Sequence, residues 1–324
     1  MKRLVSILLA GLMCVSMLAL ASCDTTTDDG KYVVGICQLL PHPALDAATQ
    51  GFIDTLTAEL GEENVTFLNE NAGNEVPVCT TIVTNLVNKN VDLILANATP
   101  ALTAAVNGTD TIPVLGTSIT EYGTALGIDG FDGLVGGNVS GTSDLAPLDQ
   151  QAAMIKEWFP EAKNIGLLYC TAEANSKYQV DTVQELLEKE GFTCEQYAFA
   201  DTNDMQAVTQ KAADASDVIY VPTDNAVAGA TGTVDGVCRA AGVPVVAGEE
   251  GICAGCGVAT LSISYYDLGC TTGKMAAQIL KGEADISTMP IAYAENFTKK
   301  YNQEICDELK LPVPEGYAAI EKAE

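Results

Sequence analysis

Apolar residues along this chain fall into two alternating patterns, short β-branched runs and longer stripes at helical spacing. The first run covers residues 31–39, and a stripe over 44–60 follows, with Leu45, Phe52 and Leu56 on one helical face. The next predicted elements are strand 64–69, helix 76–88, strand 91–96, a helix after Pro100 and strand 112–116. Alternation of this kind predicts a right-handed parallel α/β lobe.

The same pattern restarts near residue 149. Its predicted elements are helix 149–158, strand 164–169, helix 177–190, strand 192–199, helix 204–213, strand 217–221 and strand 243–247. Four successive elements agree with the first half in order and spacing, about 125 to 131 residues later. The agreement extends to Pro113 and Pro244, which occupy matching strands. A match over four elements predicts a duplicated, two-lobed chain.

Three further segments connect the two halves. The glycine-rich stretch 127–141 lacks the preceding strand and following helix of a dinucleotide-binding fingerprint, so we interpret it as a loop and an extended crossing. A second crossing over 257–264 leads to a helix over 266–281 that packs on the first lobe. The remainder returns to the second lobe, with a strand over 291–297 and a helix over 300–309.

These patterns predict an α/β fold of two Rossmann-like lobes with parallel sheets joined by three crossovers. Lobe I comprises residues 31–143 plus 265–285, and lobe II comprises 144–260 plus 286–324. Three crossings form a hinge rather than a rigid junction. Open parallel sheets bind ligands at the carboxyl ends of their strands, so we expect a site in the cleft between the lobes.

The first residues are a targeting segment. Met1-Lys2-Arg3 is positive, residues 4–20 are largely apolar, and small residues precede Cys23. We interpret 1–22 as a signal peptide and 23–30 as a tether whose Cys23 is lipid-modified, which predicts an extracytoplasmic protein anchored to the cell membrane. The alternative, an ordinary signal or a membrane-spanning anchor, is disfavoured by the shortness of the apolar run.

The net charge and the cysteine content argue against a nucleic-acid partner, a disulfide framework and a metal site. Lys and Arg number 16 against 43 Asp and Glu, a net charge of −27, which repels nucleic acid, so we expect no nucleic-acid partner. Apart from Cys14 and Cys23, nine of the 11 cysteines remain, an odd number that forces no disulfide framework. Cys253 and Cys256 have CxxC spacing, but the glycines around them predict a loop, and no second CxxC supports a metal.

Catalytic motifs are absent from the sequence. His42 is the only histidine, and no nucleophile elbow, HExxH or P-loop occurs. The number of carboxylates leaves open a glycosidase-like pair. We predict a protein that is not an enzyme, without catalytic residues, metal or cofactor.

Polar residues gather instead at the predicted carboxyl ends of the strands. The candidate ligand contacts are Gln38, His42, Thr99, Thr117, Ser118, Ser143, Asp144, Asn175, Ser176, Asp224, Asn225 and Glu249. Hydroxyls and free amides at helix N-termini suit a carboxylate, and an acidic residue suits an ammonium, so this mixture predicts a zwitterion. We expect Asp224 to hold the ammonium and the first-lobe hydroxyls and helix N-termini to hold the carboxylate. The alternative is that several of these residues only cap helices.

Several ordered motifs carry a family resemblance. They are His42-Pro43-Ala44-Leu45, Ala98-Thr99-Pro100-Ala101, Gly137-Asn138-Val139-Ser140-Gly141, Glu173-Ala174-Asn175-Ser176, Tyr220-Val221-Pro222-Thr223-Asp224-Asn225, Gly248-Glu249-Glu250 and Tyr265-Tyr266-Asp267-Leu268-Gly269. In order and content the chain resembles the TrpX-like substrate-binding lipoproteins of tryptophan/tyrosine-type ABC transporters, with a type I periplasmic-binding-protein fold. The resemblance runs from about residue 31 to 310 and departs at 251–257.

This resemblance implies a monomer that captures an amino acid, either tryptophan or tyrosine, between closing lobes. It also implies delivery of that ligand to a membrane permease coupled to an ATPase subunit. One alternative from a different class stays open, a surface small-molecule sensor or hydrolase that uses the same cleft.

Overall fold

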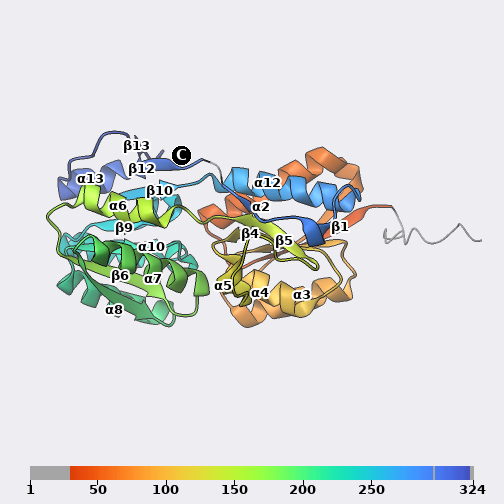
Figure 1. Ribbon diagram of the computed structural model, residues 1–324, viewed down its shortest axis with the longest axis horizontal. Coiled ribbons are helices and arrows are strands. Elements are labelled where there is room, and N and C mark those ends of the chain that lie inside the picture. The colour runs from red at the N-terminus through yellow and green to blue at the C-terminus, as the bar shows by residue number, and fades with distance from the viewer. Residues whose placement is uncertain (1–29, 295, 322–324) are drawn as a thin grey trace, which may run out of the picture.

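The computed structural model describes residues 30–294 and 296–321 as two α/β lobes lying side by side (Figure 1). The predicted signal peptide and Cys23 lie outside the described residues. No helix within those ranges combines the length and the apolar character needed to cross a membrane. Each lobe has one sheet, with a buried apolar cluster on either face of it.

The first lobe is built on a six-stranded sheet whose neighbouring strands are all parallel. In spatial order its strands are β11 (Ala292–Tyr293), β5 (Val139–Ser143), β4 (Val114–Ile119), β3 (Leu93–Asn97), β1 (Tyr32–Gln38) and β2 (Val65–Asn71). Its helices are α2 (Pro43–Leu60), η1 (Glu62–Asn64), α3 (Val76–Asn88), α4 (Thr99–Gly108), α5 (Tyr122–Leu126), α12 (Tyr265–Leu280) and η2 (Ile286–Thr288).

The second lobe is built on a seven-stranded sheet that is parallel except where β12 pairs with β10. In spatial order its strands are β13 (Ala318–Ala319), β12 (Thr298–Tyr301), β10 (Ala259–Ser262), β9 (Val245–Ala247), β8 (Val218–Val221), β6 (Asn164–Cys170) and β7 (Thr193–Phe199). Its helices are α6 (Leu148–Trp158), α7 (Ala174–Lys189), α8 (Thr202–Ala215), α9 (Asn225–Ala228), α10 (Thr231–Ala241), α11 (Glu250–Cys256) and α13 (Gln303–Leu309).

The two sheets repeat one topology. The first lobe contains the strand order β2-β1-β3-β4-β5, and the second contains β7-β6-β8-β9-β10. Each strand of the first set therefore has an equivalent in the second at the same place in its sheet. The predicted fold class, two parallel α/β lobes joined by three crossovers, is confirmed.

The third crossover lies later in the chain than we expected. The sequence predicts that residues 286–324 belong to the second lobe, with one strand over 291–297. Instead β11 pairs with β5 in the first sheet, and the chain crosses between Tyr293 and Thr298. That part of the assignment was wrong because Ile291, buried in the first-lobe core, holds the segment at the edge of β5.

Helix α12 packs along α2 on the first lobe, as predicted (Figure 1). Two glycines allow the helix backbones to approach. A Cβ atom on Gly269 would lie 2.0 Å from the Ala48 carbonyl oxygen, and one on Gly51 would lie 2.1 Å from the Tyr266 carbonyl oxygen. This packing fixes the segment that follows the second crossing on the first lobe.

Candidate functional site

All twelve side chains predicted to contact a ligand are buried, although every one is polar or charged. Their exposed fractions range from 0% for Thr117 to 8% for Asn225. They lie at or just beyond the carboxyl ends of β1, β3, β4 and β5 in the first lobe and of β6, β8 and β9 in the second. Since buried polar groups need partners, such a concentration indicates a binding site, which we call the interlobe site.

The two lobes touch directly at the interlobe site. His42 Nε2 of the first lobe lies 3.3 Å from Asn225 Oδ1 of the second. Gly229, at the end of α9, faces Leu40 so closely that an added Cβ atom would lie 2.7 Å from Leu40 Cδ1. The structure therefore has the lobes closed upon each other.

Five buried polar atoms at the carboxyl ends of these strands have no hydrogen-bond partner within the described ranges. They are His42 Nδ1, Asn97 Oδ1, Ser118 Oγ, Asp144 Oδ1 and Asn175 Oδ1. The described chain has two more such atoms, in α6 and β10 of the second lobe. Each unpaired buried atom costs about 1–3 kcal/mol, so five in one region indicate a place for a polar ligand.

On the first-lobe side, two helices begin without a side-chain cap. Ala98 precedes α4 with φ at 84°, and no side chain accepts from the first amides of that helix. His42 precedes α2 and likewise makes no capping hydrogen bond. Ser118, near the end of β4, also has a positive φ of 56°. Free amides at a helix N-terminus attract an anion, and backbone strain of this kind is typical of functional sites.

Asp224 is the N-cap of α9. Its Oδ1 accepts from the Val227 amide at 2.9 Å, and its Oδ2 accepts from the Cys170 amide at 2.7 Å. Burial raises the pKa of the Asp224 carboxyl, and these amides lower it. Both oxygens thus stabilise the second lobe itself, which weakens the assignment of Asp224 to a ligand ammonium.

Two other buried carboxylates accept hydrogen bonds from the first amides of helices in the second lobe. Glu173 accepts from the amides of Asn225 and Ala226 at 3.0 and 2.8 Å, and Glu249 caps α11 by accepting from its first amides. Burial raises the pKa of each carboxyl to about 7, and the amide hydrogen bonds act in the opposite direction. The backbone amides therefore offset only part of the cost of burying each carboxylate, and both side chains are already engaged within the second lobe.

Asp144 differs from the other buried acids because one of its oxygens is free. Oδ2 accepts from the Tyr265 hydroxyl at 2.9 Å, whereas Oδ1 has no partner. Burial raises the pKa of the Asp144 carboxyl to about 6, and the Tyr265 hydroxyl lowers it. At neutral pH this group is an anion with an open acceptor, which can bind an ammonium.

Several predicted residues are fully engaged inside the protein and shape the site. These pairs are Gln38 with Asp46 and Thr49, Thr117 with Thr142, Ser143 with Thr120, and Ser176 with Asn175. Gln38 in particular fixes the turn between β1 and α2, because its amide also donates to the Leu40 carbonyl at 2.9 Å. Their contacts position the neighbouring residues that have free atoms.

Two residues outside the twelve predicted contacts also lie beside the interlobe site, Asn97 and Tyr265. Asn97 ends the wholly buried strand β3, and a polar residue in such a strand is the signal that could have identified it. Tyr265 was one of two adjacent tyrosines, and only the fold shows that it is buried against Asp144 whereas Tyr266 is 42% exposed.

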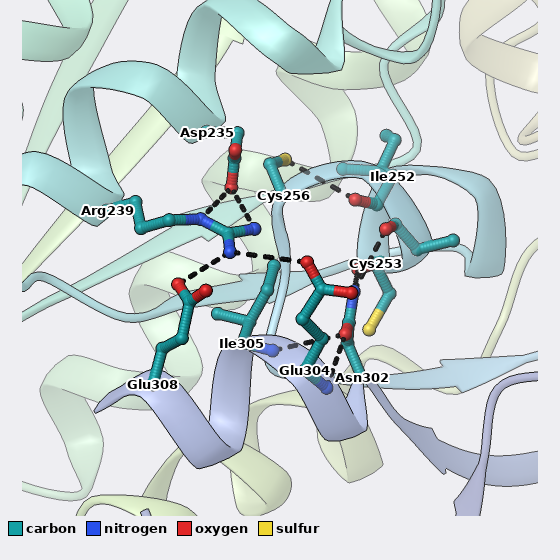
Figure 2. Close-up of polar contacts among 10 residues, drawn as sticks. Asp235, Arg239, Ile252, Cys253, Cys256, Asn302, Glu304, Ile305 and Glu308 are labelled. Carbon is teal, nitrogen blue, oxygen red and sulfur yellow. Dashed lines mark hydrogen bonds and ion pairs between the residues drawn. The ribbon is translucent and has the colours of Figure 1, made fainter. Parts of the chain in front are cut away.

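The CxxC segment is a helix, α11, so the predicted loop over 251–257 was wrong. Glu249 caps this helix, and Cys253 and Cys256 lie in its later turns, both buried, with Asn302 donating to the Cys253 carbonyl (Figure 2). Burial raises the pKa of both thiols well above its usual range. Within the described residues, no group of three or more His, Cys, Asp or Glu is placed to hold a metal ion.

Positive charge is absent from the interlobe site. Arg239, the only arginine after residue 3, binds Asp235, Glu304 and Glu308 rather than any residue of this site (Figure 2). No lysine or arginine is among the buried side chains of the described ranges. A ligand carboxylate at this site therefore meets only neutral donors, such as hydroxyls and helix amides.

Comparisons with known proteins agree with this geometry. A family described as ABC transporter substrate binding protein matches residues 33–321. A tyrosine-binding protein of Clostridioides difficile is 32% identical over 302 residues, 90% of this chain and 87% of that protein. A Streptococcus pneumoniae ABC domain solved in complex with L-Trp is 31% identical, with a TM-score of 0.85 over 90% of this chain and all of that one.

A second solved structure shows which conformation this chain has. It is a ligand-free, open substrate-binding protein from Clostridium difficile with adhesive properties, 34% identical over 90% of this chain and all of that one. Its TM-score is only 0.68, although its sequence is as similar as that of the L-Trp complex. The lobes of this chain are therefore placed as in the ligand-bound relative rather than as in the open one.

Proposed function

This chain belongs to the family of ABC transporter substrate-binding proteins, and we propose that it captures tryptophan or tyrosine between its lobes for delivery to a permease. Membership in the family confirms the resemblance that the motifs indicated. The choice of an aromatic amino acid is supported by the two relatives whose names specify tyrosine and L-Trp.

One observation carries the proposal, the cluster of unpartnered polar atoms contributed by both lobes. Ser118 Oγ comes from the first lobe, and Asp144 Oδ1 and Asn175 Oδ1 come from segments that begin or lie within the second. A zwitterion supplies both signs of charge that such a site can satisfy. Burying these atoms around a ligand favours the closed state over the open one, because opening exchanges ligand contacts for water.

We assign the ligand carboxylate and ammonium to the groups of the interlobe site that can donate to the one and accept from the other. Its carboxylate lies at the uncapped N-terminus of α4, close to Thr99, with Ser118 as a further donor. Its ammonium is held by Asp144 Oδ1, the free oxygen of a buried anion. This assignment replaces Asp224 with Asp144 as the ammonium partner, since the oxygens of Asp224 serve the backbone.

The proposal also covers the cellular setting. Cys23 is lipid-modified after removal of residues 1–22, and the lipid tethers a monomer to the outer side of the cell membrane. The closed form then docks on a permease coupled to an ATPase subunit, as the family implies. The protein binds without chemistry and releases its ligand unaltered.

The test is thermal unfolding of the chain lacking residues 1–22 against each of the twenty amino acids. We expect tryptophan or tyrosine to raise the melting temperature most, since a ligand at 100 times its Kd adds about 2.7 kcal/mol to stability. Mass spectrometry of the ligand recovered after denaturation should give its original mass. If no amino acid shifts the transition, or if the ligand is converted, the proposal fails and the sensor or hydrolase alternative returns.

A further inference from the structure

The unpartnered atoms of the interlobe site are almost all hydrogen-bond acceptors. The Asn97 amide nitrogen donates to the Leu45 carbonyl at 2.8 Å, so the oxygen Oδ1 is the free atom. The Asn175 nitrogen donates to the Thr223 carbonyl at 3.0 Å, which leaves its Oδ1 free as well. The free oxygen of Asp144 is a third acceptor. The ligand must therefore bring several donors.

His42 supplies a fourth acceptor. The Asn225 nitrogen donates to Glu173 Oε2 at 2.6 Å, so the oxygen of Asn225 faces His42 Nε2 at 3.3 Å. An amide oxygen only accepts, and Nε2 must therefore carry the hydrogen. Burial lowers the pKa of His42, which keeps the ring neutral and leaves Nδ1 with a lone pair. That atom is buried and has no partner in the described chain.

The strand order places His42 and Asp144 at opposite ends of the site. Asp144 follows β5 and His42 follows β1, with β4 and β3 between them. Three strand spacings separate β5 from β1 by about 14 Å, before the side chains reach inward. The second lobe shows the same separation. Asn225 contacts His42 at one end. Glu249 lies at the other end, where, besides burial, its charge raises the pKa of Tyr265 and the charge of Asp144 raises the pKa of Glu249.

From these contacts we infer that His42 Nδ1 selects the ligand by accepting a hydrogen bond from an N–H or O–H at the far end of its side chain. This inference rests on the proposed function and adds the selecting residue to it. The three N–H groups of the ammonium serve the Asp144 end. The indole N–H of tryptophan or the hydroxyl of tyrosine serves His42, and a phenylalanine ring leaves the buried Nδ1 unpaired.

The experiment compares matched ligand pairs on the unmodified protein by calorimetry. Tyrosine is paired with phenylalanine, and tryptophan with 3-benzothienylalanine, in which sulfur replaces the indole N–H at nearly constant shape. We expect the preferred parent to bind 10- to 100-fold more tightly, on the order of the penalty for an unpaired buried acceptor. Equal affinities within both pairs overturn the inference alone. Absence of binding by all four ligands overturns the proposed function and the inference with it.

Two variants separate selection from a structural role. His42→Phe removes the acceptor, so the parent ligand should bind less tightly, the analogue should lose its penalty, and the affinity ratio within a pair should fall to about one. A merely structural role would weaken both members of a pair equally. His42→Asn carries an amide oxygen close to the position of Nδ1 and should restore part of the ratio. A ratio that survives in His42→Phe, with a native melting transition, contradicts the inference.

Discussion

The turn after β3 and the turn after β8 occupy equivalent places in the duplicated halves, yet their chemistry is opposite. After β3, Ala98 has a positive φ and offers no cap, so the first amides of α4 are open. After β8, Asp224 has an ordinary extended backbone, and its carboxylate together with that of Glu173 accepts from the first amides of α9. The same architecture thus presents free donors on one lobe and a compensated acid on the other.

This difference shows that a duplication predicts where functional residues lie but not what they do. Both turns follow a buried central strand, and both carry polar residues. Only the hydrogen bonds distinguish a turn that receives a ligand from a turn that holds its own lobe together. The free acidic oxygen of the site belongs instead to Asp144, at the first crossing between the lobes.

The largest effect is expected from placing a negative charge in the turn after β3, where α4 has no side-chain cap. Thr99→Asp places a carboxylate at the N-terminus of α4, where we propose that the ligand carboxylate binds. Like charges side by side in a buried interface cost several kcal/mol, so the affinity for the amino acid should fall by more than about 100-fold in calorimetry. Thr99→Ser, which keeps the hydroxyl, is the control and should bind nearly as the parent does. Retained affinity in Thr99→Asp would mean that the carboxylate lies elsewhere.

Removing the cap from the turn after β8 should lower stability rather than ligand affinity. Asp224→Ala leaves the amides of Val227 and Cys170 without their buried partner, and we expect the free energy of unfolding to fall by about 2–4 kcal/mol in urea. Asp201→Ala is the matched control, because Asp201 caps α8 at an exposed position and its loss should cost about 1 kcal/mol. If Asp224→Ala keeps its stability and loses only binding, our original assignment of Asp224 to the ammonium is restored.

The smallest effect is the pH dependence of stability, which arises from Glu173 and Glu249 in the second lobe and Asp144 at the first crossing. Burial raises the pKa of Asp144 to about 6 and those of Glu173 and Glu249 to about 7. Carboxyls in the unfolded chain titrate near pH 4, so these three groups bind more protons in the folded protein than in the unfolded chain between about pH 4 and 7. The stability of the ligand-free protein should therefore decrease as pH rises through that window.

Melting temperatures between pH 5 and 8, recorded without ligand, check this expectation. We expect a decline of a few degrees, and Glu249→Gln should make the profile flatter because it removes one of the three titrating groups. A melting temperature that rises steadily from pH 5 to 8 would show that the hydrogen bonds to these carboxyls outweigh their burial.

Much of the fold could be predicted because its signals are local. The stripe on α2 and the β-branched runs of β1 and β8 specify their elements directly. The two failures have different causes, since the first is a local cap that outweighs the glycines and the second is a contact remote in sequence. Glu249 caps a glycine-containing segment into α11, and the edge of β5 draws Ile291 and the residues after it to the first sheet.

By itself, the sequence determined the two lobes, their duplication and the set of strand ends where polar residues gather, because hydrophobic periodicity and repeated spacing are properties of the chain. The tertiary structure alone decided which of those residues has a free atom. Asp144 and Asp224 are indistinguishable as acids after strands, and they differ only because backbone amides of β6 and α9 reach both oxygens of Asp224 and leave Oδ1 of Asp144 alone. Hydrogen bonds between distant segments are set by packing, which no local pattern encodes.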